Sequence, residues 1–414
     1  MAIFKPFKSY LPKEEFVEQI AAVPYDVLST EEARELVKDN SLSFLHIDKA
    51  EIDLPTSISP YDELVYETAK NNLNRLINDG YYSKDNVNCY YIYRLTMLNR
   101  TQTGIVGTAS IDDYMNNVIK KHELTRDDKL VDRIKHVDIC NAQTGPIFLT
   151  YKSSEDLNKI LKDNVLNNEN IYSFVAEDGI KHEIWRISDS EIVENISTLF
   201  NNIDSLYIAD GHHRTASAVK VGLNRRNQVK EEKTDASYNY FLSVVFPHDE
   251  LLIMDYNRLV SNVNLNDFTQ FLDMLTKSFE IEKVNANFKP EKKGEIGMYH
   301  DKSWYKLVVK KSCYTNNKVQ DLDVSILQRL ILEPQFGIVD PKTDKRLDFV
   351  GGIRGIEELV TKVDSGMAEL AFALYPTSIE EVMEISDEEK QMPPKSTWFE
   401  PKLRSGIFIN SLDE

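Results

Sequence analysis

Near its middle the chain passes from a run of apolar residues to a run of ionisable ones. The side chains of this second run could take part in catalysis or bind an anion. The five residues after the apolar run 206–209 are Asp210, Gly211, His212, His213 and Arg214. The run has the length of a buried strand, and the alanine-rich residues beyond Arg214 predict a helix. A helix that begins at such a turn offers unpaired backbone N–H groups and the positive end of its dipole to a phosphate or carboxylate. The turn is therefore predicted to be a functional site, with a capping Asp210 and surface histidines as the structural alternative.

A second acid upstream could complete an acid–base pair with this turn. Glu123 follows His122 before a predicted helix, residues 126–140. If the fold brings Glu123 to Asp210, one carboxylate can accept the proton of a substrate hydroxyl while neighbouring cations hold the electrophile. The alternative for His122 and Glu123 is a solvated helix start. Adjacent histidines on a helix diverge by about 100°, so a single metal ion held by both His212 and His213 is not expected.

Two further segments could contact a substrate or a phosphate. Tyr25 and Asp26 follow a proline on a predicted loop, where a turn-forming aspartate is an equal alternative. Three prolines stiffen residues 392–402, a predicted loop that presents Lys395, Ser396, Thr397 and Lys402. Two ammonium groups beside two hydroxyls could bind phosphate oxygens, although solvated surface lysines explain the composition as well.

Composition excludes several classes of protein. The net charge of −18, from 49 basic and 67 acidic residues, repels nucleic acid at long range, and no dense basic patch compensates. No apolar stretch approaches the roughly 18–20 residues of a membrane span, and Lys5 and Pro6 interrupt any signal-peptide core. The three cysteines are far apart and lack metal-ligand spacing, so buried thiols are expected. We expect a cytoplasmic protein that binds neither nucleic acid nor membrane, and its oligomeric state leaves no trace in the sequence.

The order of predicted elements indicates an α/β (α+β) chain of three zones: an N-terminal α/β segment, residues 1–115; a central domain that holds the turn, residues 116–225; and a C-terminal α/β segment, residues 226–414. The first zone is predicted to contain a strand at residues 41–47 and helices at residues 30–38 and 61–79. In the third zone, residues 266–279 are predicted to form a helix with apolar positions every three to four residues.

The central zone resembles the free-serine kinases of the ParB/sulfiredoxin-like fold. The resemblance rests on the strand, the Asp210–Arg214 turn, the alanine-rich helix, the His122–Glu123 pair and a strand that begins at Pro146–Ile147. Over its whole length the chain is similar to the family of domains of unknown function number 1015, through residues 24–27, 210–214, 363–366 and 392–397. A long insertion between residues 151 and 206 departs from the small kinases and separates Glu123 from the turn.

The kinase resemblance implies transfer of the γ-phosphoryl group of ATP to free L-serine, with Mg²⁺, to give O-phospho-L-serine. ADP or another phosphate compound as the donor, and a different hydroxy amino acid as the acceptor, are the alternatives that the sequence leaves open. By position, Glu123 would take the hydroxyl proton, Asp210 would orient the substrate, and His212, His213 and Arg214 would bind phosphate or carboxylate. We therefore expect catalytic roles for Glu123, Asp210 and His212. Substrate or phosphate contacts are expected from His122, Gly211, His213, Arg214, Thr215, Tyr25, Asp26, Lys395, Ser396, Thr397 and Lys402. A ParB-like nucleotide-binding scaffold and a phosphohydrolase are the alternatives, and no walker-type GxxxxGK[ST] or protein-kinase motif is present.

Overall fold

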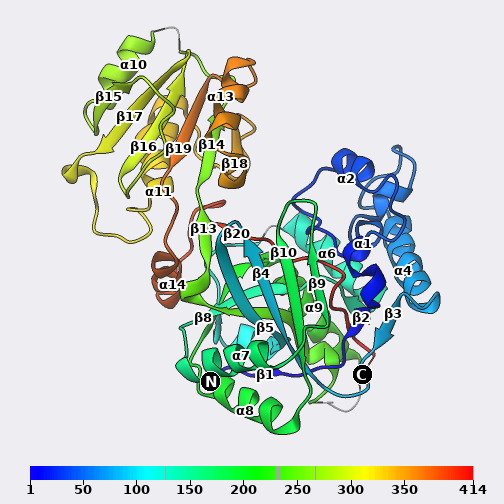
Figure 1. The fold of residues 1–414 in the computed structure, drawn as a ribbon. Helices are drawn as coiled ribbons and strands as arrows, with labels where there is room; N and C mark the ends of the chain where they lie inside the picture. Colours follow the sequence, from blue (N-terminus) through cyan, green and yellow to red (C-terminus); the bar gives the residue numbers. More distant parts are fainter. Residues whose placement is uncertain (126, 230–233, 266, 414) are drawn as a thin grey trace. The chain divides into compact units, whose positions relative to one another are not determined.

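Helices and strands alternate along the chain in a mixed α/β fold, as the sequence predicts (Figure 1). The computed structural model describes residues 1–125, 127–229, 234–265 and 267–413. These residues form two compact units. The first unit comprises residues 1–121, 125–251 and 401–414, and the second comprises residues 252–400 together with the short segment 122–124.

A nine-stranded mixed sheet forms the centre of the first unit. Its order is β6 (Ile119–Lys120), β11 (Leu206–Asp210), β8 (Ile147–Tyr151), β12 (Tyr240–Pro247), β5 (Arg100–Ser110), β4 (Tyr90–Met97), β10 (Lys181–Ile187) and β9 (Tyr172–Val175), with β1 (Phe4–Lys5) also paired to β5. The pairs β6–β11 and β8–β12 are parallel, and the other neighbours are antiparallel. Strands β8, β11 and β12 are buried almost throughout, as expected for strands covered on both faces.

Helices from three parts of the sequence share one apolar core with this sheet. Leu157 of α7 (Glu155–Asn167) and Phe200 of α8 (Ser190–Asn201) belong to the same buried cluster as Ala218 of α9 (His212–Gln228). Burial of a leucine or phenylalanine side chain contributes about 1.5–3 kcal/mol. Helix α9 is therefore anchored through its buried face, and the turn that precedes it is held in place.

A second core lies among the N-terminal helices α2 (Thr30–Leu36), α3 (Leu45–Asp48) and α4 (Glu63–Asn78). Ser29 and Glu32 form a capping box at the start of α2. Helix α6 (Asp127–Cys140) packs against both α4 and α9. The strand predicted at residues 41–47 is wrong, because α3 begins within it. Periodicity does not distinguish a buried strand from a buried helical turn in so short an apolar run.

The two units do not coincide with the three zones, 1–115, 116–225 and 226–414, expected from the sequence. Strand β12 of the third zone pairs with β5 of the first zone and with β8 of the second. One sheet therefore joins all three zones. Pairing between strands so far apart in sequence leaves no local signal in composition.

An antiparallel six-stranded sheet forms the second unit. Its order is β15 (Phe279–Val284), β17 (Ser303–Val309), β16 (Glu295–His300), β19 (Leu370–Leu374), β14 (Tyr256–Val260) and β18 (Leu347–Gly351). Helices α10 (Phe268–Leu275) and α13 (Ile356–Asp364) also belong to it (Figure 1). The helix predicted over residues 266–279 is too long, because α10 ends at Leu275 and Phe279 already begins β15; residue 266 lies outside the described residues.

The proline-rich segment is not the uninterrupted loop that the sequence predicts. Residues Trp398–Glu400 form β20, which pairs with β13 (Leu252–Met254). Two aromatic residues, Trp398 and Phe399, pair with the apolar Met254 and Ile253, and the flanking prolines lie outside the strand.

Cys89 and Cys140 are buried free thiols, as expected, whereas the free thiol of Cys313 is partly exposed. Among the described residues, none of the helices combines the length and the apolar character needed to traverse a bilayer.

Candidate functional site

The strand, turn and helix predicted around Asp210 are confirmed. Strand β11 ends at Asp210, Gly211 adopts a left-handed conformation with φ of 93°, and α9 begins at His212. A side chain rarely adopts this conformation, so glycine suits the position. The Asp210 carboxylate accepts a hydrogen bond from the Gly211 amide at 3.0 Å, and the Gly211 carbonyl accepts one from the Thr215 hydroxyl at 3.0 Å.

Two cations stabilise the ionised form of Asp210. The Lys402 ammonium lies 3.2 Å from Asp210 Oδ2, and Arg214 Nη2 lies 3.7 Å from the same oxygen. Burial alone would raise the pKa of Asp210, but the charges of Lys402 and Arg214 outweigh it and hold that pKa well below its usual range. Asp210 is therefore a carboxylate at neutral pH, able to accept hydrogen bonds and not to donate a proton.

Arg214 connects the turn to the neighbouring strand. Its Nη1 donates to the carbonyl of Pro146, just before β8, at 2.8 Å. A methyl group added at Gly211 would lie 3.1 Å from Arg214 Nε, so the guanidinium packs directly under the turn. This fixed position leaves the guanidinium between the turn and the start of β8.

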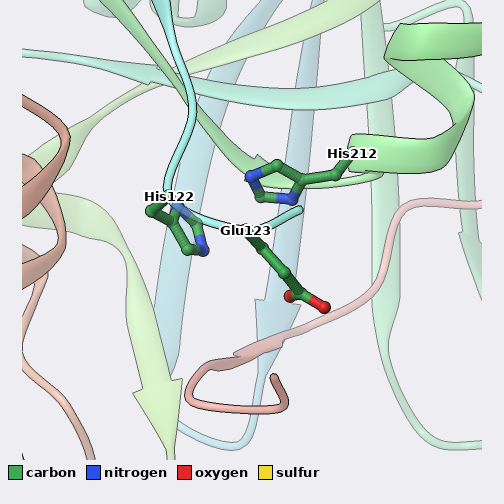
Figure 2. Close-up of side chains that lie close together, drawn as sticks. All are labelled: His122, Glu123 and His212. Carbon is green, nitrogen blue, oxygen red and sulfur yellow. The ribbon is translucent and has the colours of Figure 1, made fainter. Parts of the chain in front are cut away.

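His122, Glu123 and His212 form a close group (Figure 2). One potential ligand atom of each residue lies within 4.8 Å of the others. His122 and His212 are buried, and Glu123 is partly exposed. Figure 2 shows the His212 side chain extending from the first turn of α9 towards His122 and Glu123.

Strand pairing explains why residues so far apart in sequence meet. Lys120 of β6 is in parallel register with Tyr207 of β11. The chain continues from Lys120 to Glu123 over three residues, and from Tyr207 to His212 over five. Residues 121 and 125 both belong to the first unit, so the segment 122–124 is tied to it at both ends.

Two imidazoles and one carboxylate form a donor set with a definite chemical preference. Such a set suits Zn²⁺ or Fe²⁺, whereas Mg²⁺ prefers oxygen ligands. The group therefore does not build a dedicated magnesium site. A single carboxylate is nevertheless enough to assist a magnesium ion whose other ligands are phosphate oxygens and water.

The remaining predicted residues have different surroundings. His213 is partly exposed on α9, whereas Thr215 is fully buried with its hydroxyl bonded to Gly211. Tyr25 is partly buried and Asp26 is exposed, both on a turn of the first unit. Lys402 belongs to the first unit, where it forms an ion pair with Asp210.

Lys395, Ser396 and Thr397 belong to the second unit. Lys395 is exposed, with a left-handed φ of 60°. The Ser396 hydroxyl is buried and donates to the Pro393 carbonyl at 2.7 Å. The Lys395 carbonyl accepts a hydrogen bond from Arg258 Nη2 at 3.0 Å, which fixes the backbone of this turn.

Sequence reasoning did not find Arg133 or the carbonyl of Pro146. Arg133 lies on α6 and its guanidinium stacks on the Tyr25 ring, 4.0 Å from the ring centroid. In the sequence it is one of several charged residues on an amphipathic helix, and nothing marks it out. The run of apolar residues after Pro146 did signal a buried strand, but not the hydrogen bond at its start.

Comparison with known proteins gives a family and several distant structural neighbours. The model of the family "Protein of unknown function (DUF1015)" matches residues 4–325. No curated protein matches the chain. Among solved structures, a free serine kinase in complex with AMP is similar at 14% identity and a TM-score of 0.36, over 72% of this chain and 86% of that chain.

Two further solved structures are similar to a comparable extent. A conserved hypothetical protein from Pyrococcus furiosus has 15% identity and a TM-score of 0.37, over 74% of this chain and 94% of that chain. SbnI with a C-terminal truncation, from Staphylococcus aureus, has 10% identity and a TM-score of 0.38, over 71% of this chain and 82% of that chain. The family match includes both the turn at Asp210 and the segment with Tyr25, and it spans well over half of the sequence. The chain therefore belongs to the DUF1015 family.

Proposed function

We propose that this protein is a small-molecule kinase that transfers the γ-phosphoryl group of ATP to free L-serine and forms O-phospho-L-serine. The observation that carries the proposal is the grouping of Glu123 with His122 and His212, the first residue of α9, within 4.8 Å. A carboxylate, two imidazoles and a helix N-terminus are the groups that this reaction needs: a base for the hydroxyl and positive charge for the phosphates.

Glu123 is the proposed general base. It is partly exposed, so a substrate hydroxyl can reach it, and it adjoins the N-terminus of α9. In the reaction, the serine hydroxyl oxygen forms a bond to the γ-phosphorus while the bond from that phosphorus to the β–γ bridging oxygen breaks. The hydroxyl proton passes to Glu123, and ADP leaves with the bond's electron pair.

Asp210 is proposed to orient the substrate and not to take the proton. Lys402 and Arg214 keep it ionised, and a carboxylate whose pKa lies so low is a weak base. It can accept hydrogen bonds from the ammonium group of an amino acid. The backbone N–H groups of the first turn of α9, with His212 and His213, provide the phosphate-binding end of the site.

Magnesium is proposed only as the companion of the ATP phosphates, whose charge it neutralises. The group of His122, Glu123 and His212 does not suit Mg²⁺ as an all-protein site, so the proposal assigns no step to protein-bound metal.

The direct test is to measure ADP formation from ATP and Mg²⁺ with and without L-serine. A serine-dependent rate accompanied by phosphoserine supports the kinase. Equal release of inorganic phosphate with and without serine indicates a phosphohydrolase in which Glu123 activates water. Nucleotide binding without turnover indicates a scaffold of the ParB-like kind, and either outcome overturns the proposal.

A further inference from the structure

A small cavity within the first unit is lined by Arg214 of α9 and by residues of α6. It has a volume of about 40 Å³, and its lining includes Tyr25, Arg133, His136, Thr144 and Arg214. A water molecule needs roughly 10–15 Å³ of such space, so the cavity has room for about three water-sized groups. That is the size of a carboxylate group, and it is too small for a phosphoryl group with its oxygens.

Two guanidinium groups line the cavity and retain hydrogen-bond donors. Arg133 donates from Nε to Asp132 at 2.8 Å and from Nη1 to the Asp48 carbonyl at 3.4 Å. Its Nη2 has no hydrogen-bond partner among the described residues. Arg214 uses Nη1 for the Pro146 carbonyl, and the one interaction of its Nη2 within the described part of the chain is the 3.7 Å ion pair with Asp210. The N–H groups of a planar guanidinium match the two oxygens of a carboxylate.

The Tyr25 hydroxyl is a third donor at this cavity. Its ring lies against the Arg133 guanidinium, with 4.0 Å between the ring centroid and Cζ. Burial raises the pKa of the Tyr25 hydroxyl well above its ordinary value, so the group keeps its proton at neutral pH and can donate it. Within the part of the chain that the structure describes, the hydroxyl has no hydrogen-bond partner, which leaves it available to a ligand.

The charges that face the cavity favour an anion. Asp132 and Asp210, the carboxylate partners of the two arginines, are not part of its lining. Asp48 is the acid in the lining, and its Oδ1 accepts a hydrogen bond from the Thr144 hydroxyl at 2.9 Å. His136 also lines the cavity, and burial together with the charge of Arg133 lowers its pKa, so it is neutral at pH 7. Two cations therefore face one anion.

We propose that this cavity binds the carboxylate group of the small-molecule substrate, with Tyr25, Arg133 and Arg214 as donors. The inference rests on the proposed function for the identity of that substrate, L-serine. It makes these three residues determinants of specificity for an amino acid over the corresponding neutral alcohol.

The test compares L-serine with L-serinamide, in which a neutral amide of similar shape replaces the carboxylate. For the wild-type protein we expect a KM for L-serinamide at least about tenfold higher than that for L-serine, because a hydrogen bond to a charged group is worth more than one to a neutral group. Tyr25→Phe retains the ring on Arg133 and removes the hydroxyl. It should raise the KM for L-serine about tenfold with kcat nearly unchanged, and should leave the KM for L-serinamide within about twofold.

Tyr61→Phe is the matched control, because Tyr61 is exposed and lies outside the cavity lining. Calorimetric titration with L-serine and L-serinamide gives a readout that does not depend on catalysis. If the protein makes no phosphoserine but Tyr25→Phe weakens L-serine binding selectively, the proposed kinase function fails and the carboxylate site stands. If phosphoserine forms and Tyr25→Phe changes neither KM nor binding, the carboxylate site is wrong.

A second variant, Arg133→Lys, retains the positive charge beside Asp132. It should also raise the KM for L-serine, and an unchanged KM would count equally against the site.

Discussion

The Lys402 ammonium lies 3.2 Å from the Asp210 carboxylate, although 192 residues separate the two in sequence. The C-terminal segment of the first unit thus supplies a cation to the turn at the start of α9. Together with Arg214, Lys402 more than offsets the effect of burial on the pKa of Asp210. Two expectations about this turn follow, one electrostatic and one conformational.

Replacement of Lys402 by methionine should shift the acid side of the pH–activity profile. Without that ammonium, burial opposes ionisation of Asp210 and its pKa rises towards the ordinary range of an aspartate. Loss of a neighbouring charge changes a carboxyl pKa by about 1–3 units. The rate of serine phosphorylation by Lys402→Met should therefore fall at a higher pH than that of the wild type. Lys390→Met removes a lysine that pairs with Glu388 and serves as the control. An acid limb at the same pH in both variants would contradict this role of Lys402.

Replacement of Gly211 by alanine should damage activity as well as stability. Gly211 has a φ of 93°, and an added Cβ would lie 3.1 Å from Arg214 Nε. A left-handed conformation costs a non-glycine residue about 1–2 kcal/mol. Gly179→Ala is a matched control, because its φ is 78° and an added Cβ meets nothing within 4 Å. Thermal unfolding should show a similar loss of stability for both variants. The value of kcat/KM should fall at least about tenfold in Gly211→Ala alone, because displacement of a group in the site lowers the rate strongly. Equal activity of the two variants would show that the turn has no role in the reaction.

The Glu123→Gln variant separates binding from chemistry. Glutamine has nearly the same shape as glutamate but accepts no proton at neutral pH, so kcat should fall by about 100-fold or more, the range of general-base catalysis. The dissociation constant for ATP, measured by titration calorimetry, should change by less than about threefold. A kcat near that of the wild type would remove Glu123 from the mechanism, and a large loss of ATP affinity would make it a nucleotide ligand instead.

In the second unit, Asp323 should make stability depend on pH. This buried carboxyl accepts hydrogen bonds from the Gly294 amide, and burial raises its pKa to about 7. Between the unfolded value near 4 and about 7, the folded protein holds a proton that the unfolded chain releases, so stability falls as the pH rises through this range. The loss is at most about 4 kcal/mol, from about 1.4 kcal/mol per pKa unit.

The Asp323→Asn variant tests this dependence. It cannot ionise, so its free energy of unfolding in urea should exceed that of the wild type at pH 8 and should differ less at pH 5. Asp321→Asn makes the same change of charge two residues away, and its stability difference from the wild type should not grow in this way as the pH rises. A stability difference for Asp323→Asn that is constant with pH would contradict the buried titration.

Much of the site's local structure could be predicted from sequence, because strand periodicity, a glycine at the turn and an alanine-rich helix are local signals. The strand β11 and the helix α9 follow from them. The approach of Glu123 to this turn could be stated from the residues only as a condition, since it depends on the parallel pairing of β6 with β11. Single-sequence periodicity carries no information about which strands pair.

Other features of the site could not be predicted, because they too depend on contacts between segments that are distant in sequence. Lys402 looked like a phosphate ligand of a proline-rich loop, yet it pairs with Asp210, and Lys395 to Thr397 belong to the other unit. Arg133 is one of several charged residues on a predicted helix and has no distinguishing feature in the sequence, yet its half-buried side chain stacks on Tyr25 and pairs with Asp132. The position of each of these side chains depends on contacts between segments more than 100 residues apart in sequence. Composition and periodicity, which are local signals, do not report such contacts.

The most direct test of the central claim is ³¹P NMR of the purified protein with ATP, Mg²⁺ and L-serine. The account predicts that the γ-phosphate resonance of ATP declines as resonances of phosphoserine and ADP grow at equal rates, with Glu123→Gln slower by about 100-fold or more. Growth of inorganic phosphate alone, at a rate that L-serine does not change, would contradict it.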